Sequence, residues 1–381
     1  MDSLMIETPK SATVPLAEGP GKLAEGPLFV VGMFRSGTSL LYALLNQHPQ
    51  IALMYEGDLA HLPSLFWFPT DTPHWMAKWN FWNGAVSRHK IDPKSVPAGI
   101  SDLRTAVREA YVAYAEQKPG ATIWGCKSPT YFDEISRLAR TFPNARFVII
   151  WRDLRSIARS ILKAAEKPSY FRRAGMMLRA LLGYHEIKVE CDRLLFEGVP
   201  VHQISYEDLV RNPAEVMQGI CEFLQIPFDP KMTSLKGADR SAIEDAPHHS
   251  RVKDKHIVAP EQDFTDIPPA LESKIDRYLV LWRKQYRGAW PLYPQTLKAT
   301  AEPSFWERVR DRLEYVCLRC WYHTTPVVFS MVPLRLWKFY RKLRGRPYAA
   351  DEVYELSSEN NGNSPRADQP ESVPLQNTDY E

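Results

Sequence analysis

Short apolar runs alternate with amphipathic, helix-patterned segments through residues 27–295. Four of the runs have the length and apolar content of buried parallel strands, namely residues 28–31, 123–126, 146–151 and 201–205. Apolar residues recur at helical spacing from residue 40 to residue 45 and in six later segments: 102–117, 131–141, 154–165, 174–196, 213–224 and 271–286. This alternation predicts an α/β fold, a doubly wound parallel sheet with flanking helices, in which ligands bind at the carboxyl ends of the strands.

Composition divides the rest of the chain into three segments. Residues 1–26 are polar and residues 347–381 are acidic with few apolar positions, so we expect two disordered tails. Residues 296–346 predict a basic, amphipathic helical appendage, because Arg and Lys are mixed there with aromatic and aliphatic residues, above all in 304–346. Two readings of this appendage stay open: contact with an anionic membrane surface or a partner, and a helix pair packed on the main domain.

Net charge and cysteine content narrow the class of protein. The formal net charge of +3 for 381 residues is too small to predict nucleic-acid binding. Five cysteines in a long chain are typical of reduced thiols, and the pair Cys317 and Cys320 lacks a second pair nearby, which favours packing over zinc binding. We see no signal peptide, membrane span or metal motif, and expect a cytoplasmic protein that is peripheral at the membrane.

A loop reading Gly32-Met33-Phe34-Arg35-Ser36-Gly37-Thr38-Ser39 joins the first predicted strand to a helix. Such a loop holds phosphate, because its amides point into one concavity and the helix N-terminus adds positive potential. The loop nearly matches the nucleoside-triphosphatase motif, but Thr38 stands where that motif has its lysine, which argues against ATP hydrolysis. With a cation at Arg35, the loop suits a 5′-phosphate that carries one further anionic group.

The segment 34–39 resembles the 5′-phosphosulfate loop of sulfotransferases, which use 3′-phosphoadenosine 5′-phosphosulfate (PAPS). The segment 152–160 resembles the family's 3′-phosphate motif, R-D-P-R-x-x-x-x-S, with Leu154 in place of proline. An arginine fork and a hydroxyl suit a doubly charged phosphate, although Arg152 alone could equally pair with Asp153. Together with the segment 206–213, these motifs make residues 27–290 similar to the sulfotransferase family, nearest to the branch with the tyrosylprotein sulfotransferases.

The resemblance implies a set of residues around the donor PAPS. The loop residues Arg35, Ser36, Gly37, Thr38 and Ser39 would hold its 5′ end, and Arg152 and Ser160 its 3′-phosphate. Tyr206 would lie near the adenine, although its sequence Y-E-D-L is also typical of a structural turn. Ser250 and Lys255, with Lys253 as an alternative to Lys255, would close over the nucleotide from a polar, basic loop.

The same branch places a general base 21 positions after the loop arginine, where this chain has Glu56. A buried carboxylate there could take the proton of an acceptor hydroxyl. His48 and His61 are rival bases, and His48, directly before Pro49, is better explained as a helix-end histidine. Lys127 resembles the family's catalytic lysine, which with Arg35 would stabilise charge on the leaving phosphate; a solvated surface lysine is the alternative.

We therefore expect a sulfotransferase that moves a sulfuryl group from PAPS to an acceptor hydroxyl on a lipid, a glycan, a small molecule or a tyrosine. Tyr55 and Asp58 depart from the pattern of the protein-tyrosine enzymes, and the aromatic-rich stretch 61–82 favours an amphiphilic acceptor. One alternative is a P-loop-type nucleoside or sugar kinase, which would need a loop lysine and a magnesium-binding carboxylate. The other is a non-catalytic protein that binds a membrane or a partner through its basic segment.

Overall fold

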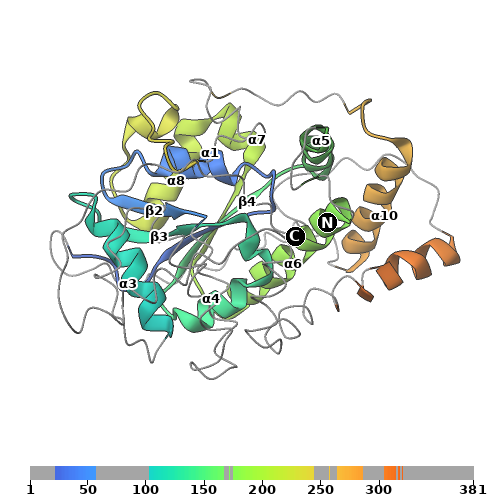
Figure 1. Cartoon of the computed structure of the whole chain (residues 1–381), viewed down its shortest axis with the longest axis horizontal. Coiled ribbons are helices and arrows are strands. Elements are labelled where there is room, and N and C mark those ends of the chain that lie inside the picture. Colours follow the sequence, from blue (N-terminus) through green and yellow to red (C-terminus); the bar gives the residue numbers. More distant parts are fainter. Residues whose placement is uncertain are drawn as a thin grey trace, which may run out of the picture.

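The computed structural model describes residues 22–56, 103–166, 171, 175–243, 257, 264–285, 304–314, 316–317 and 320. Within them the chain forms a five-stranded sheet of order β2-β3-β1-β4-β5, in which every pair of neighbours is parallel (Figure 1). Its strands are β1 (Leu28–Val31), β2 (Ile51–Tyr55), β3 (Ile123–Lys127), β4 (Arg146–Trp151) and β5 (Val201–Ser205). The predicted doubly wound parallel sheet is confirmed.

Helices cover both faces of this sheet because its side chains alternate between two hydrophobic clusters. Phe29 and Val31 of β1 belong to one cluster, and Leu28 and Val30 to the other. The second cluster includes α1 (Thr38–Leu45), α7 (Tyr206–Arg211), α8 (Pro213–Leu224) and the short η5 (Pro230–Thr233). The first includes α3 (Leu103–Glu116), η3 (Pro129–Asp133), α4 (Ile135–Thr141), α5 (Leu154–Ala165), α6 (Met176–Phe196) and α10 (Pro269–Gln285).

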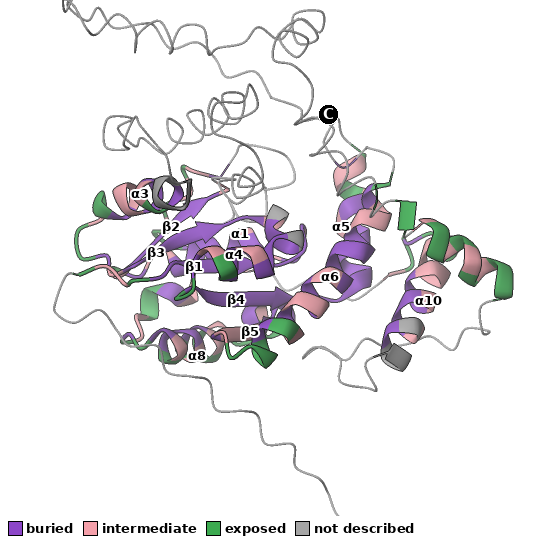
Figure 2. Cartoon of the chain, turned by 90° about the horizontal axis from the view of Figure 1, so that it is seen from below, coloured by how far each residue is buried: buried purple, intermediate pink, exposed green. Residues whose placement is uncertain are grey.

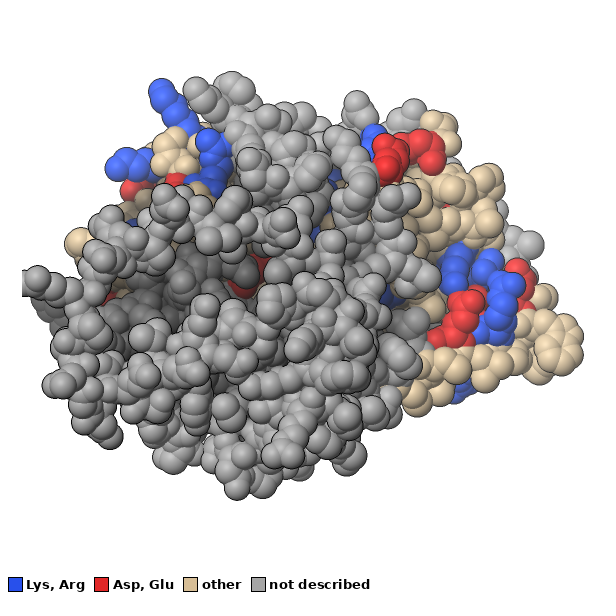
Figure 3. All heavy atoms as spheres, viewed as in Figure 1, with Lys and Arg blue, Asp and Glu red and all other residues tan. Residues whose placement is uncertain are grey.

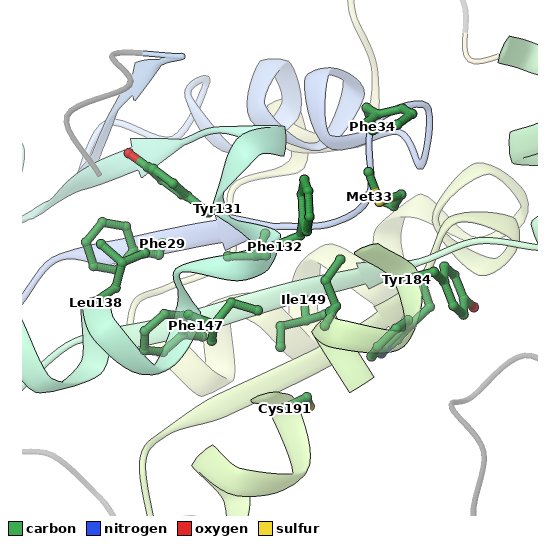
Figure 4. Packing of buried hydrophobic residues seen from close by; sticks show 14 of the residues in the cluster. Phe29, Met33, Phe34, Tyr131, Phe132, Leu138, Phe147, Ile149, Tyr184 and Cys191 are labelled. Carbon is green, nitrogen blue, oxygen red and sulfur yellow. The ribbon is translucent and has the colours of Figure 1, made fainter. Parts of the chain in front are cut away.

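Aromatic side chains fill much of the first cluster. The ring of Phe29 lies 5.6 Å from that of Phe147 and 5.7 Å from that of Tyr131, measured between centroids (Figure 4). Buried residues continue along the strands and into α6, whereas the outer helix faces are exposed (Figure 2). Close packing of this kind resists deformation, so the strand ends form a fixed platform for side chains that follow them.

Gly125 in β3 lies directly against Leu28 of β1. A Cβ at this position would lie 2.0 Å from the Leu28 carbonyl oxygen, and the φ angle is +156°. We expect Gly125→Ala to lower the free energy of unfolding by roughly 3 kcal/mol, measured by chemical denaturation. Gly120→Ala is the control, because Gly120 has a φ of +86° but open space around it, which leaves roughly 1 kcal/mol of backbone strain. Equal losses in the two variants would contradict the steric explanation.

Four details differ from the sequence predictions, the first being strand β2, which was not predicted. The single helix predicted over 131–141 is two elements, η3 and α4, and the Y-E-D-L segment begins the helix α7 rather than forming a turn. Cys317 and Cys320 are exposed, so the prediction that they are packed was wrong. Both thiols belong to helical residues near the end of the described chain, in a helix that forms ion pairs with α10.

Several predicted features lie outside the described residues. They are residues 1–21 and 347–381 of the two tails, the stretch 61–82, His61, Ser250, Lys253, Lys255 and most of the appendage 296–346. The last residues of the predicted N-terminal tail, 22–26, are ordered, because the Ala24 amide donates to the Thr122 carbonyl at 2.7 Å and the Ala24 carbonyl accepts from the Trp124 ring, so the prediction of disorder up to residue 26 was wrong there. In the part that is described, no helix combines the length and the apolar content needed to cross a bilayer.

Candidate active site

The predicted site residues follow the carboxyl ends of the strands, which all meet at one edge of the sheet. Glu56 follows β2, Lys127 is the last residue of β3, Arg152 follows β4, and Tyr206 follows β5. The loop 32–37 follows β1, the central strand. The helices after β1 and β4 lie on opposite faces of the sheet, and open α/β sheets bind ligands at such a point, between the two loops.

The loop between β1 and α1 is shaped by Gly37. This residue precedes α1 with a φ of +100°, and a Cβ there would lie 2.3 Å from the Tyr206 ring, so only glycine fits. The Ser36 amide donates to the Met33 carbonyl at 2.9 Å, which closes the turn. The Ser36 hydroxyl is buried and has no hydrogen-bond partner among the described residues. Buried hydroxyls normally have such a partner, so this one is in place to bind a ligand in the loop.

Arg35 ties this loop to α5. Its Nε donates to the Ser160 hydroxyl at 2.9 Å, and its guanidinium carbon lies 5.6 Å from the centre of the Phe171 ring. Its own carbonyl accepts a hydrogen bond of 2.7 Å from Arg152 Nη1. The structure therefore brings Arg35 of the loop into direct contact with both Arg152 and Ser160, which are far from it in sequence.

Arg152 is buried and stacks on Tyr206, with its guanidinium carbon 4.1 Å from the ring centre. The neighbouring Asp153 carboxylate caps α5 by accepting from the Ser156 amide at 2.9 Å. Glu207 accepts from the Asp153 amide at 3.2 Å. Burial raises the pKa of both Asp153 and Glu207, and the positive charge of Arg152 opposes that rise. Asp153 thus organises the start of α5, while Arg152 faces the loop.

Lys127 and Glu56 form an ion pair on the other side of the loop. Lys127 Nζ lies 2.5 Å from Glu56 Oε1, 3.2 Å from the Ser39 hydroxyl and 4.2 Å from the centre of the Tyr55 ring. The Tyr55 hydroxyl completes the cluster by contacting Ser39 at 2.9 Å. Lys127 is only 1% exposed, so the alternative of a solvated surface lysine is wrong. Glu56 keeps 27% of its side chain exposed and remains accessible to a second molecule.

Backbone strain occurs at two of the predicted site residues, Arg35 and Glu56. Among the described residues other than glycine, positive φ angles occur at Arg35 (69°), Glu56 (44°) and Gln225 (57°). Gln225 ends α8 in a left-handed conformation, which is common at helix ends. The Glu56 amide donates to the Lys127 carbonyl at 2.7 Å, which holds its backbone in place. Strain of about 1–3 kcal/mol per residue is typical of positions whose orientation serves a function.

His48 has a structural setting. Its Nε2 contacts the Pro227 carbonyl at 2.8 Å, and its Nδ1 accepts from the Gln50 amide at 3.1 Å. Burial is the largest cause that lowers its pKa below the ordinary value, which favours the neutral ring. Both ring nitrogens are therefore occupied, as expected of a histidine that fixes the end of α1.

Ten predicted site residues lie at this edge of the sheet: Arg35, Ser36, Gly37, Thr38, Ser39, Glu56, Lys127, Arg152, Ser160 and Tyr206. The structure adds three contacts that the sequence motifs did not indicate, from Tyr55, Phe171 and Glu207. The sequence had marked Tyr55 only by its place before Glu56 and by its departure from the pattern of the protein-tyrosine enzymes. Among the described residues, no group of three or more His, Cys, Asp or Glu side chains is placed to hold a metal ion.

Comparison with solved structures returns sulfotransferases at low similarity. A sulfotransferase domain from the curacin biosynthetic pathway is 20% identical and has a TM-score of 0.45, with 71% of this chain and 100% of that domain covered. A mouse sulfotransferase complexed with PAP is 12% identical and has a TM-score of 0.38, with 69% of this chain and 86% of that one covered.

Among curated proteins, the chain is similar to protein-tyrosine sulfotransferase 1 of Danio rerio, with 25% identity over 210 residues. It is also similar to protein-tyrosine sulfotransferase A of Caenorhabditis elegans, with 24% identity over 206 residues. The matches cover 53% and 54% of this chain, and 54% and 51% of the respective relatives, so the chain spans about half of their length. The sequence profile of the sulfotransferase family matches residues 27–230, which is more than half of the chain, and this protein therefore belongs to the sulfotransferase family.

Proposed function

We propose that this protein transfers a sulfuryl group from PAPS to the hydroxyl of an acceptor. The observation that carries the proposal is the placement of two cationic side chains, Lys127 and Arg152, on opposite sides of one phosphate-type loop. Lys127 and Glu56 lie on one side, and Arg152 with Ser160 on the other. A donor with phosphate groups at both its 5′ and 3′ ends needs such a pair of sites, joined by a loop that binds one of them.

The donor's two ends have separate partners in this proposal. The 3′-phosphate is bound by Arg152, which Tyr206 stacking holds in place, and by the Ser160 hydroxyl. The 5′ end is bound by the amides of the loop, and the buried Ser36 hydroxyl supplies a further donor, since no described residue uses it. The Arg35 side chain contacts Ser160 and is therefore close to the 3′-phosphate side as well as to the loop.

Chemistry takes place where Glu56 and Lys127 meet. The acceptor oxygen attacks the sulfur and loses its proton to the Glu56 carboxylate, while the bond between sulfur and the bridging oxygen of the 5′-phosphate breaks. The electron pair of that bond stays on the bridging oxygen, whose charge the Lys127 ammonium stabilises. Lys127 is already positioned by Ser39 at the start of α1, so little reorganisation is needed.

Calorimetric binding of 3′,5′-adenosine bisphosphate (PAP), AMP and ATP, with and without magnesium, tests the donor. We expect PAP to bind more tightly than AMP and without metal, because Arg152 recognises the phosphate that AMP lacks. Arg152→Ala should weaken PAP binding about 100-fold, the loss of roughly 3 kcal/mol of charge-assisted hydrogen bonding, and should leave AMP binding nearly unchanged.

Arg211→Ala is the matched control, because Arg211 is an exposed arginine at the end of α7 that lies 3.6 Å from Asp208. It should bind PAP as the unmodified chain does. A preference for ATP with magnesium would overturn the proposal in favour of a kinase. Absence of any nucleotide binding would favour a non-catalytic protein.

A further inference from the structure

A helix follows α10 in the described part of the chain and lies beside it. Residues 305–314 are helical, as are residues 316, 317 and 320, and we refer to them together as the surface helix. Its acidic residues Glu307, Asp311 and Glu314 are spaced by four and three positions, so they form one stripe along the helix. This stripe decides which side of the helix faces the protein.

The acidic stripe faces α10. Glu314 lies 2.5 Å from Lys274, and Arg277 lies 3.1 Å from Asp311 and 3.5 Å from Glu307. Figure 3 shows blue and red side chains gathered together over this region, at the right of the molecule. The surface helix is therefore attached to the domain through its charged side, the reverse of an ordinary surface helix, which buries its apolar side.

The apolar side of the surface helix is consequently turned outward. Phe305 is 63% exposed, Trp306 75%, Leu313 60% and Val316 48%. Among the described residues, the other exposed large hydrophobic side chains are Leu195 and Phe196 at the end of α6. Figure 2 shows this helix as largely exposed beside the more buried α10. An apolar stripe of this length on one helix indicates a binding surface rather than scattered exposure.

Three exposed arginines flank that stripe, namely Arg308, Arg310 and Arg312. Arg310 also lies 3.9 Å from the Asp311 carboxylate, at the border with the acidic stripe. Because the acidic residues are used against α10, the outward side combines aromatic and aliphatic residues with positive charge. That combination is typical of helices that lie in the interface of an anionic bilayer.

We propose that the surface helix binds an anionic membrane surface, with Phe305, Trp306, Leu313 and Val316 in the headgroup region and the three arginines on acidic phosphates. Charge selects this partner over a second copy of the chain. In a symmetric dimer the same face would meet itself and would place the arginines of both copies together, which is repulsive. A bilayer with acidic lipids complements both the apolar stripe and its positive flanks.

Vesicle sedimentation with the full-length protein tests the proposal, using phosphatidylcholine alone and phosphatidylcholine mixed with phosphatidylglycerol. We expect binding to the mixed vesicles, weakened by salt. Replacing Arg308, Arg310 and Arg312 by Gln should reduce the partition coefficient about 100-fold, and Phe305→Ser with Trp306→Ser should reduce it at least 10-fold.

A matched control pairs Phe196→Ser with Arg193→Gln, because this exposed aromatic and this arginine lie in the last turn of α6, whereas the surface helix forms its ion pairs with α10. The control should bind vesicles as the unmodified chain does. Cys317 and Cys320 are exposed whereas Cys126, Cys191 and Cys221 are buried, so a polarity-sensitive thiol dye labels the surface helix selectively. The emission of the attached dye should shift to the blue when the protein binds mixed vesicles, and should not shift with vesicles of phosphatidylcholine alone.

Three results would overturn the proposal. Equal binding to neutral and acidic vesicles would show that the arginines do not recognise acidic lipids. No binding to either kind of vesicle would exclude a membrane as the partner of the surface helix. Light scattering that shows a dimer, abolished by Trp306→Ser, would assign the apolar stripe to a second copy of the chain. None of these results depends on sulfuryl transfer, so this proposal and the proposed activity fail separately.

Discussion

Glu56→Gln is expected to lower the turnover of PAPS roughly 10²–10⁴-fold while PAP still binds, because the amide cannot accept the acceptor's proton. The amide oxygen can still accept the hydrogen bond from Lys127 that the carboxylate now accepts at 2.5 Å, so the local fold should persist. Turnover is measured as PAP released in the presence of simple alcohols, phenols and an acidic tyrosine peptide, with whichever acceptor supports it. A loss of turnover with retained PAP binding would show that the variant lacks the general base but keeps the donor site.

Glu109→Gln is the control for this variant. Glu109 is 31% exposed, close to the 27% of Glu56, and forms an ion pair with Arg108 on α3 at 2.9 Å. Its replacement should leave turnover unchanged. Full activity in Glu56→Gln would exclude Glu56 as the base and would return attention to His61.

Lys127→Met is expected to have the second large effect, a fall of about 10³-fold in turnover with a loss of about 10-fold in PAP affinity. The split arises because charge on the bridging oxygen is greatest in the transition state, where Lys127 acts, and smaller in the bound nucleotide. Single-turnover kinetics and PAP calorimetry measure the two quantities separately. Equal losses in the two quantities would assign Lys127 to binding alone.

Lys188→Met provides the matched control, because Lys188 is also a buried lysine that pairs with a carboxylate, Asp192 on the same helix. Both variants remove an ammonium from a buried position next to a partly exposed acid. Similar changes in stability with a loss of turnover only in Lys127→Met would separate catalysis from folding. A comparable loss of turnover in both variants would point to a general effect on the fold.

Much of the fold could be predicted from the sequence because buried parallel strands are continuous apolar runs. The run at 146–151 is β4 to the residue, and the run at 28–31 is β1. Strand β2 was not predicted. Its sequence, Ile51 to Tyr55, directly follows a helical segment, and a short apolar run there cannot be assigned to strand or helix by periodicity alone.

The site was predictable where a motif fixes both residue type and spacing. Arg35, Ser160 and Arg152 were each found in this way, and the structure places them in contact. The stacking of Phe171 under Arg35 and the contact of Tyr55 with Ser39 depend on tertiary packing, which has no local pattern. Likewise, the outward apolar side of the surface helix depends on ion pairs with α10 that sequence spacing does not show.

The order of the strands bears on the synthesis of the protein. Strands β1 and β2 leave the ribosome before β3, yet they share no hydrogen bonds, because β3 inserts between them. The loop that carries Arg35 and the strand that carries Glu56 therefore acquire their relative position only when β3, with Lys127, has been translated and paired. Long-range parallel pairing of this kind is slow. A nascent chain therefore cannot form its Glu56–Lys127 pair until β3 has joined β2 in the sheet.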